Sequence, residues 1–171
     1  MPRIGLISDS HASAAITGRA AALLADRGAE MLLHLGDICS EPVLDALLAP
    51  APGAGSPLPV HIVFGNMDFE TESLGRYARR LGIEVDHPAG RLDCGAARLA
   101  FMHGHEKSPV LAALEEGVDY LCYGHTHVAA DERHGKTRMI NPGALYRTPA
   151  PSVALLDTGT DTLEKVAVPK G

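Results

Sequence analysis

Apolar runs and helix-like stretches alternate along the first half of the chain. Three short apolar runs are each closed by a polar turn, which is typical of buried strands; they cover residues 3–8, 31–35 and 60–64. Helices are predicted between and after these strands, over residues 12–27, 41–48 and 71–81. This alternation predicts parallel strands joined by right-handed crossovers.

The pattern changes after residue 83, where the chain becomes a series of short strands. Strands are predicted over residues 91–94, 98–102, 120–123, 137–140, 152–156 and 163–168, with one helix at about 109–116. The second half therefore looks more antiparallel, which indicates a mixed sheet. The Pro- and Gly-rich stretch at 49–59 is too short to link two domains, so residues 1–171 are expected to form a single domain.

Polar residues follow five of the predicted strands, each time directly at the end of the strand. They are Asp9-Ser10-His11, Gly36-Asp37, Gly65-Asn66, His103-Gly104-His105 and Gly124-His125-Thr126-His127. In open α/β sheets ligands gather at the carboxyl ends of the strands, so this repeated placement predicts a shared site. Each motif alone is a weak signal, because a Gly-Asp or Gly-Asn pair is also a good turn. The order of all five along one chain carries the prediction.

The residue types in these motifs suit divalent metal ions. Imidazole nitrogen and carboxylate oxygen are ligands for such ions, and a carboxylate has two oxygens with which to bridge a pair of them. Asp37 suits the bridging role because Gly36 lets the backbone turn tightly before it. Two aspartates against two divalent ions leave about two positive charges, which attract a phosphate. Ions about 3.5–4 Å apart can clamp phosphoryl oxygens while a bridging water attacks in line.

Composition narrows the remaining classes of function. A formal net charge of −6 argues against a general nucleic-acid surface, but it leaves room for a small phosphorylated substrate. Cys39, Cys94 and Cys122 lack CxxC spacing and fit a reducing compartment. No apolar run is long enough for a signal peptide or a membrane span. We therefore expect a cytoplasmic protein without membrane contact, and a homo-oligomer stays open.

The motifs together resemble the calcineurin-like metallophosphoesterase superfamily, whose pattern is DxH, GD, GN, H and GHxH. The resemblance covers about residues 4–143 and includes the Asn141-Pro142-Gly143 turn of the small prokaryotic phosphodiesterase-like branch. It implies a mixed α/β fold, a four-layer αββα sandwich of two mixed sheets flanked by helices. It also implies hydrolysis of phosphodiester or activated phosphomonoester bonds by attack of a metal-bridging hydroxide.

The resemblance further implies two divalent metal ions per chain, with manganese first and iron, zinc, cobalt or nickel as alternatives. One ion would take Asp9, His11, Asp37 and His127; the other would take Asp37, Asn66, His103 and His125. Asp37 and Asn66 thereby become catalytic residues as well as ligands.

One position departs from the family pattern. Many relatives have a His directly after the Asn of the third motif, where it is proposed to protonate the leaving group. This chain has Met67 there, which cannot transfer a proton, followed by Asp68, which is expected to orient a ligand His. His105 could replace the missing acid, contact the substrate, or merely pack.

The other histidines are expected to lie outside the site. His34 and His61 fall inside apolar strands and are interpreted as core residues, whereas His87 and His134 are expected in solvent. Two readings compete with the enzyme. One is a protein-interaction scaffold, as in the retromer subunit that this branch resembles, but such scaffolds typically have an impaired metal site. The other is a structural zinc protein, which would favour Cys ligands.

Overall fold

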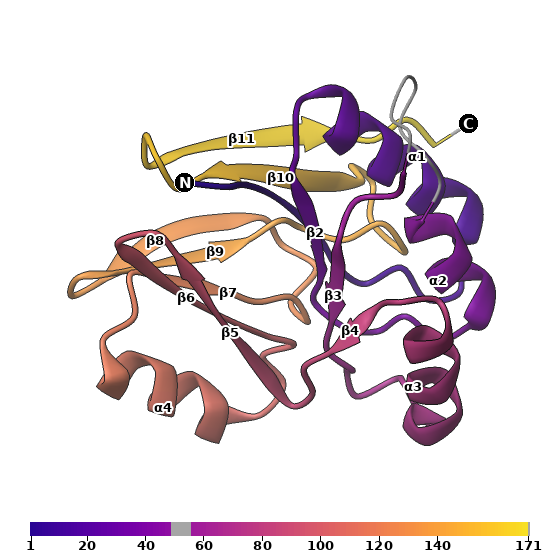
Figure 1. The fold of residues 1–171 in the computed structure, drawn as a ribbon, viewed down its shortest axis with the longest axis horizontal. Helices are drawn as coiled ribbons and strands as arrows, with labels where there is room; N and C mark the ends of the chain where they lie inside the picture. Colours follow the sequence, from indigo (N-terminus) through magenta and orange to yellow (C-terminus); the bar gives the residue numbers. More distant parts are fainter. Residues whose placement is uncertain (49–55, 171) are drawn as a thin grey trace.

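Two β-sheets lie face to face in the computed structural model, with helices on both outer sides (Figure 1). The structure describes residues 1–48 and 56–170. Most of the predicted loop at 49–59 lies outside these residues; within them, no helix has both the length and the apolar character needed to cross a membrane.

The first sheet contains six strands in the order β11–β10–β1–β2–β3–β4. They are β1 (Arg3–Ile7), β2 (Met31–His34), β3 (Val60–Ile62), β4 (Glu84–Val85), β10 (Ser152–Asp157) and β11 (Thr162–Ala167). Strands β1 to β4 run parallel, as the alternation of strands and helices predicts. The antiparallel pair β10–β11 extends the sheet beyond β1, which therefore has a neighbour on each side.

The second sheet contains five strands in the order β5–β6–β7–β9–β8. They are β5 (Ala89–Cys94), β6 (Ala97–Met102), β7 (Tyr120–Cys122), β8 (Ala130–His134) and β9 (Thr137–Asn141). Strands β6, β7 and β9 are parallel, whereas the edge strands β5 and β8 are antiparallel to their neighbours. Both sheets are thus mixed.

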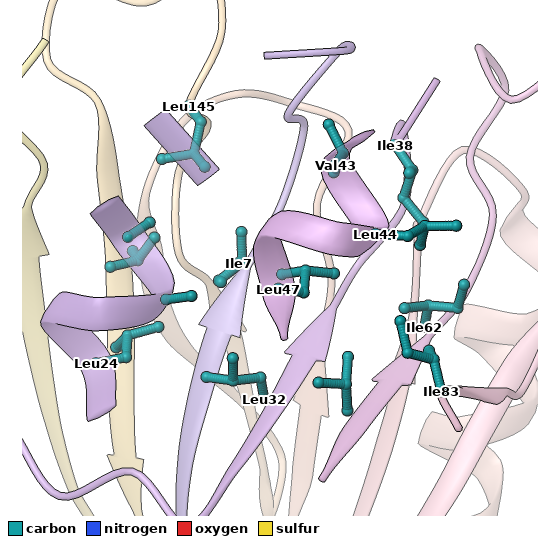
Figure 2. Close-up of a cluster of buried hydrophobic side chains, with 14 of the residues drawn as sticks. Ile7, Leu24, Leu32, Ile38, Val43, Leu44, Leu47, Ile62, Ile83 and Leu145 are labelled. Atoms are coloured by element: carbon teal, nitrogen blue, oxygen red, sulfur yellow. The ribbon is translucent and has the colours of Figure 1, made fainter. Parts of the chain in front are cut away.

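Three helices cover the outer face of the first sheet, and the fourth covers the second sheet. They are α1 (Ala14–Asp26), α2 (Glu41–Leu47), α3 (Thr71–Arg80) and α4 (Lys107–Glu116). Figure 2 shows Leu24 and Leu47 from the helices packed over Ile7, Leu32 and Ile62 of the strands. Burial of each such side chain contributes about 1.5–3 kcal/mol.

The period-two alternation of side chains along a strand divides the remaining apolar residues between two further cores. Ile4 and Leu6 of β1 point away from the helices and meet Leu99 and Phe101 of β6 in the space between the sheets. Met102, on the other face of β6, packs under α4. The predicted four-layer αββα sandwich is confirmed by these three cores.

The structure has two strands that the sequence pattern did not predict. β4 has only two residues, Glu84 and Val85, which is too short to show a pattern. β8 is largely exposed and almost entirely polar, so no apolar alternation marks it; it forms because its backbone pairs with β9. His134, predicted in a loop, therefore ends a strand, although it is exposed to solvent as expected.

Candidate metal centre

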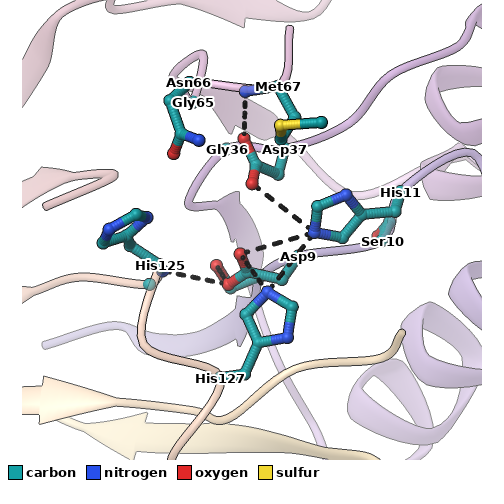
Figure 3. Close-up of polar contacts among 12 residues, drawn as sticks. Asp9, Ser10, His11, Gly36, Asp37, Gly65, Asn66, Met67, His125 and His127 are labelled. Carbon is teal, nitrogen blue, oxygen red and sulfur yellow. Dashed lines mark hydrogen bonds and ion pairs between the residues drawn. The ribbon is translucent and has the colours of Figure 1, made fainter. Parts of the chain in front are cut away.

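Five polar loops leave the carboxyl ends of strands and meet at one edge of the two sheets. The loops after β1, β2 and β3 come from the first sheet, and those after β6 and β7 come from the second. Figure 3 shows side chains of four of these loops turned toward one another. The site therefore straddles both sheets.

Asp9 is at the centre of one group of side chains. Its buried Oδ1 lies 3.2 Å from His127 Nε2 and 3.9 Å from His11 Nε2, and the two imidazole nitrogens are 3.3 Å apart. Ligand atoms about 2.1 Å from a tetrahedral ion lie about 3.4 Å from one another, so most of these spacings suit one shared ion. Asp9 Oδ1 has no hydrogen-bond partner among the described residues. A buried carboxylate oxygen without a partner fits a metal ligand.

Asp37 presents one oxygen to each of two histidines. Its Oδ2 lies 3.4 Å from His11 Nε2, and its Oδ1 lies 3.4 Å from His103 Nε2. His103 Nε2 is also 3.1 Å from Asn66 Oδ1. Donor atoms of Asp9, Asp37 and His103 thus form a second group beside the first. Asp9 belongs to both groups, and the two oxygens of Asp37 each face one histidine of a different group.

His125 and His105 lie beside these groups rather than in them. The His125 amide donates a hydrogen bond to Asp9 Oδ2 over 3.1 Å, while its ring packs edge-on to the His103 ring, with centroids 5.2 Å apart. The His105 ring lies 5.3 Å from the His103 ring and 6.1 Å from the His125 ring. The three rings therefore share one wall of the site, and both His105 and His125 are exposed.

The electrostatic environment prepares Asp37 and His11, but not His103, to bind a cation. Burial alone would raise the pKa of Asp37, but its hydrogen bonds with His103 and the Met67 amide reverse the effect and lower it. Burial lowers the pKa of His11 and outweighs the nearby Asp37 carboxylate, which favours the neutral, metal-binding imidazole. For His103 burial has the same sign, but the hydrogen bond and charge of Asp37 outweigh it and raise the pKa.

Most candidate ligands have a backbone conformation that non-glycine residues rarely adopt. Five of them have positive φ angles: Asp9 at 55°, His11 at 40°, Asp37 at 56°, His125 at 67° and His127 at 59°. Such conformations cost about 1–3 kcal/mol each and persist only when surrounding structure enforces them. Here the loops brace one another, since the amides of Asp9 and His11 donate to the carbonyls of Gly36 and Asp37.

Gly65 and Gly124 are required because side chains of other loops lie too close to them to leave room for a Cβ atom. A Cβ on Gly65 would lie 2.1 Å from Asp37 Oδ1, and a Cβ on Gly124 would lie 1.9 Å from Ser8 Oγ and 2.9 Å from Asp9 Oδ2. Any side chain at either position would displace a carboxylate of the site. The glycines before Asn66 and His125 therefore make room for the acids of other loops.

Asp68 does not orient a ligand histidine, contrary to the sequence prediction. Its two oxygens accept hydrogen bonds from the amides of Cys39 and Gly65, at 2.7 and 2.8 Å. Asp68 therefore ties the loop after β2 to the loop after β3. The orienting group for His103 is the Leu35 carbonyl, 2.7 Å from His103 Nδ1, so Nδ1 carries the proton and Nε2 faces the site.

His34 is a buried core residue, as predicted, and it also braces two motif loops. The Gly36 amide donates to its Nδ1 over 3.3 Å, so the proton lies on Nε2, which donates to Ser10 Oγ over 2.7 Å. Complete burial, followed by the proximity of His103, lowers the pKa of His34 to about 3. This neutral ring thus connects the Asp9-Ser10-His11 turn to the Gly36-Asp37 turn.

The structure also assigns places to residues that sequence reasoning misjudged or missed. His61 is only half-buried and pairs with Asp86, with Nδ1 and Oδ2 2.9 Å apart, so its core assignment was wrong. His87 is exposed as predicted. Ser8 donates a 2.6 Å hydrogen bond to Asp9 Oδ2, and the Tyr146 ring lies 5.2 Å from the His11 ring. Neither Ser8 nor Tyr146 has a motif spacing that could have revealed it.

Comparisons with known proteins agree with one another. The family model of the calcineurin-like phosphoesterase superfamily domain matches residues 2–161. The chain is 33% identical to the phosphodiesterase YfcE of Escherichia coli, over 85% of this chain and 80% of that one. It is 27% identical to a phosphodiesterase of Methanocaldococcus jannaschii, over 91% and 93% of the two chains. A solved archaeal phosphodiesterase superimposes with a TM-score of 0.82 at 25% identity, covering 97% of this chain and 99% of that one.

The buried His34 predicts a specific sensitivity to acid. Its pKa of about 3 in the folded protein lies below the ordinary value of 6.5, so the unfolded chain binds a proton first as pH falls. This contribution to stability is complete above pH 6.5 and is lost as pH falls below it. Between pH 7 and pH 5, the free energy of unfolding should drop about 2 kcal/mol more in the wild type than in His34→Gln. Chemical denaturation at both pH values measures it.

His134→Gln is the matched control, because His134 is exposed at the end of β8. Its pH dependence should follow that of the wild type. Parallel stability curves for the wild type and His34→Gln would contradict the buried neutral state of His34.

Proposed function

Because the chain belongs to the calcineurin-like phosphoesterase superfamily, we propose that it is a phosphodiesterase that works with two divalent metal ions. The observation that carries this proposal is the position of Asp37. One of its oxygens faces His11, in the group around Asp9, and the other faces His103, each at 3.4 Å. A single-ion site would not need a carboxylate between two sets of donors.

Each ion would have four protein ligands, one of them shared. The first set is Asp9, His11, Asp37 and His127, and the second is Asp37, Asn66, His103 and His125. A mixed set of imidazole and carboxylate ligands suits several divalent ions; manganese is the ion proposed first, with iron, zinc, cobalt or nickel as alternatives. His125 would have to turn its ring from its place beside His103 to bring a nitrogen to the second set. Bound ions would polarise phosphoryl oxygens and acidify the attacking water.

Side chains of the site would balance part of the charge of the ions and protonate the leaving group. Asp9 and Asp37 balance only part of the charge of two divalent ions, so the site would attract the single negative charge of a phosphodiester. Met67 follows Asn66 and is 41% exposed. Because a thioether carries no acidic proton, Met67 cannot protonate the leaving group. His105, on the wall with His103 and His125, is the proposed donor to the leaving group.

A non-catalytic scaffold on the same fold accounts less well for the site. A scaffold does not need Asp9 buried with an unpartnered oxygen, nor five ligand residues held at positive φ. Such features are costly unless they serve a function at the site itself. We therefore favour the enzyme, whose substrate would be a small phosphorylated molecule.

The first test is metal content. Protein purified without chelator, then reloaded with Mn²⁺, should bind two ions per chain, and chelation should abolish hydrolysis of a model diester. Elemental analysis together with activity provides the measurement. Full activity at a stoichiometry that never exceeds one ion would reject the dinuclear site.

The second test compares Asp37→Asn with Asn66→Ala. Asp37→Asn removes both the negative charge and the bridge, so kcat/KM at saturating metal should fall by at least about 100-fold. Asn66→Ala removes one neutral ligand and should cost less. Thermal unfolding should show that both variants fold, because both residues lie in loops at strand ends. Near-normal turnover in Asp37→Asn would contradict its assigned role.

The third test concerns His105 and the leaving group. A positioned general acid contributes roughly 10²–10⁴-fold, and mostly for leaving groups that need a proton. His105→Ala should therefore slow an alkyl ester far more than a p-nitrophenyl ester, and aryl diesters should be preferred to alkyl monoesters. Equal slowing of both esters would limit His105 to binding phosphate, and no slowing would leave it a packing residue.

A further inference from the structure

A hollow of about 540 Å³ opens directly beside the candidate metal centre. It lies between the start of α2 and the loop that joins β3 to α3. Its wall includes Cys39, Ser40, Glu41, Met67, Phe69 and Glu70. We call it the Met67 hollow.

Two wall residues of the Met67 hollow contact residues of the candidate metal centre. The Met67 amide donates a 2.9 Å hydrogen bond to Asp37 Oδ1. Cys39 Sγ lies 3.9 Å from His11 Nδ1. A phosphodiester bound beside Asp37 would therefore lie next to this hollow, which one of its ester groups could reach.

The wall presents apolar side chains to solvent. Met67 is 41% exposed and Phe69 is 80% exposed, although both could in principle have been packed into the core. The Ser40 hydroxyl oxygen is buried and has no hydrogen-bond partner among the described residues. Exposed apolar groups on one wall indicate a binding surface for an organic group.

The charge of the wall is negative. Glu41 and Glu70 both line the hollow, and neither forms an ion pair with another described residue. No Lys, Arg or His belongs to the wall as described. By contrast, Glu72 on the adjacent α3 is neutralised by Arg76 one helical turn later.

A second hollow has the opposite charge. It begins at Tyr146, whose ring lies 5.2 Å from the His11 ring, and its wall includes Arg19, Arg147 and Lys170. His11 thus lies between Cys39 of the Met67 hollow and Tyr146 of this basic hollow. An anionic ester group would be drawn to the basic hollow, which leaves the Met67 hollow for a neutral or positively charged group.

We propose that the Met67 hollow binds one ester arm of the phosphodiester substrate and that this arm carries an ammonium group. Glu41 and Glu70 supply the compensating charge, and the exposed ring of Phe69 supplies a face on which a cation can rest. The inference rests on the proposed phosphodiesterase activity and narrows its substrate class to phosphodiesters of amino or quaternary ammonium alcohols.

The test compares two diesters that differ only in charge. p-Nitrophenyl phosphorylcholine carries a quaternary ammonium, and its p-nitrophenyl 3,3-dimethylbutyl analogue has carbon in place of nitrogen. The Mn²⁺-loaded enzyme should show a KM about three- to tenfold lower for the choline ester, because partly exposed carboxylates and one aromatic ring attract the cation modestly. Values of kcat should be similar, since the reacting bond is the same.

Substitutions separate this effect from general electrostatics. The double variant Glu41→Gln/Glu70→Gln should bring the KM ratio of the two esters close to one. Glu72→Gln, outside the hollow, should leave the ratio unchanged. Equal KM values in the wild type, or an equal loss of the ratio in Glu72→Gln, would overturn the proposal.

A binding measurement distinguishes failure of this inference from failure of the proposed function. Choline alone, titrated into the wild-type protein, should shift the amide resonances of Met67 and Phe69, and the double variant should lose the shift. If neither diester is hydrolysed but choline shifts these resonances, the phosphodiesterase proposal fails and the cation site stands. If both diesters are hydrolysed and choline shifts nothing in the Met67 hollow, the cation site is wrong.

Discussion

The buried carboxylate of Asp9 is the interaction on which the arrangement of this protein depends. Asp9 follows β1 in the first sheet, and its Oδ2 accepts hydrogen bonds from Ser8 and from the amide of His125, which follows β7 in the second sheet. A buried carboxylate oxygen without a hydrogen bond is costly, so a positive partner at Asp9 Oδ1 would stabilise the fold. The same contact therefore joins the two sheets and creates the demand for a cation.

The loops around Asp9 also depend on one another for their backbone conformation. Loops that carry ligands at positive φ can persist only if neighbouring loops hold them, and here each loop is held by another. Asp68 ties the loop after β2 to the loop after β3, and His34 ties the loop after β1 to the loop after β2. These contacts brace the three loops against one another, and braced ligands are the condition for selecting an ion by geometry.

Most of the fold follows from the sequence because its strands are marked by local signals. Apolar runs and the polar turns after them located nine of the eleven strands in residues 1–48 and 56–170, and the motifs identified a family with a known arrangement of layers. β8 escaped prediction because its side chains are exposed and only its pairing with β9 defines it. The role of Asp68 was misjudged because carboxylate-to-amide contacts between loops leave no pattern in the sequence. The ligand set stays a prediction, and the exposed ring of His125 shows why residue spacing cannot fix a side chain's direction.

The order of strands in the first sheet has a consequence for synthesis of the chain. Among the described strands β1 comes first in chain order, yet one of its two neighbours, β10, follows it by more than 140 residues. The amide of Tyr146, just before β10, also donates to the carbonyl of Asp9. While a ribosome is still making residues 142–157, β1 has a free edge and Asp9 lacks part of its support. Asp9 therefore gains its full set of contacts only after β10 has been made, long after the strand that carries it.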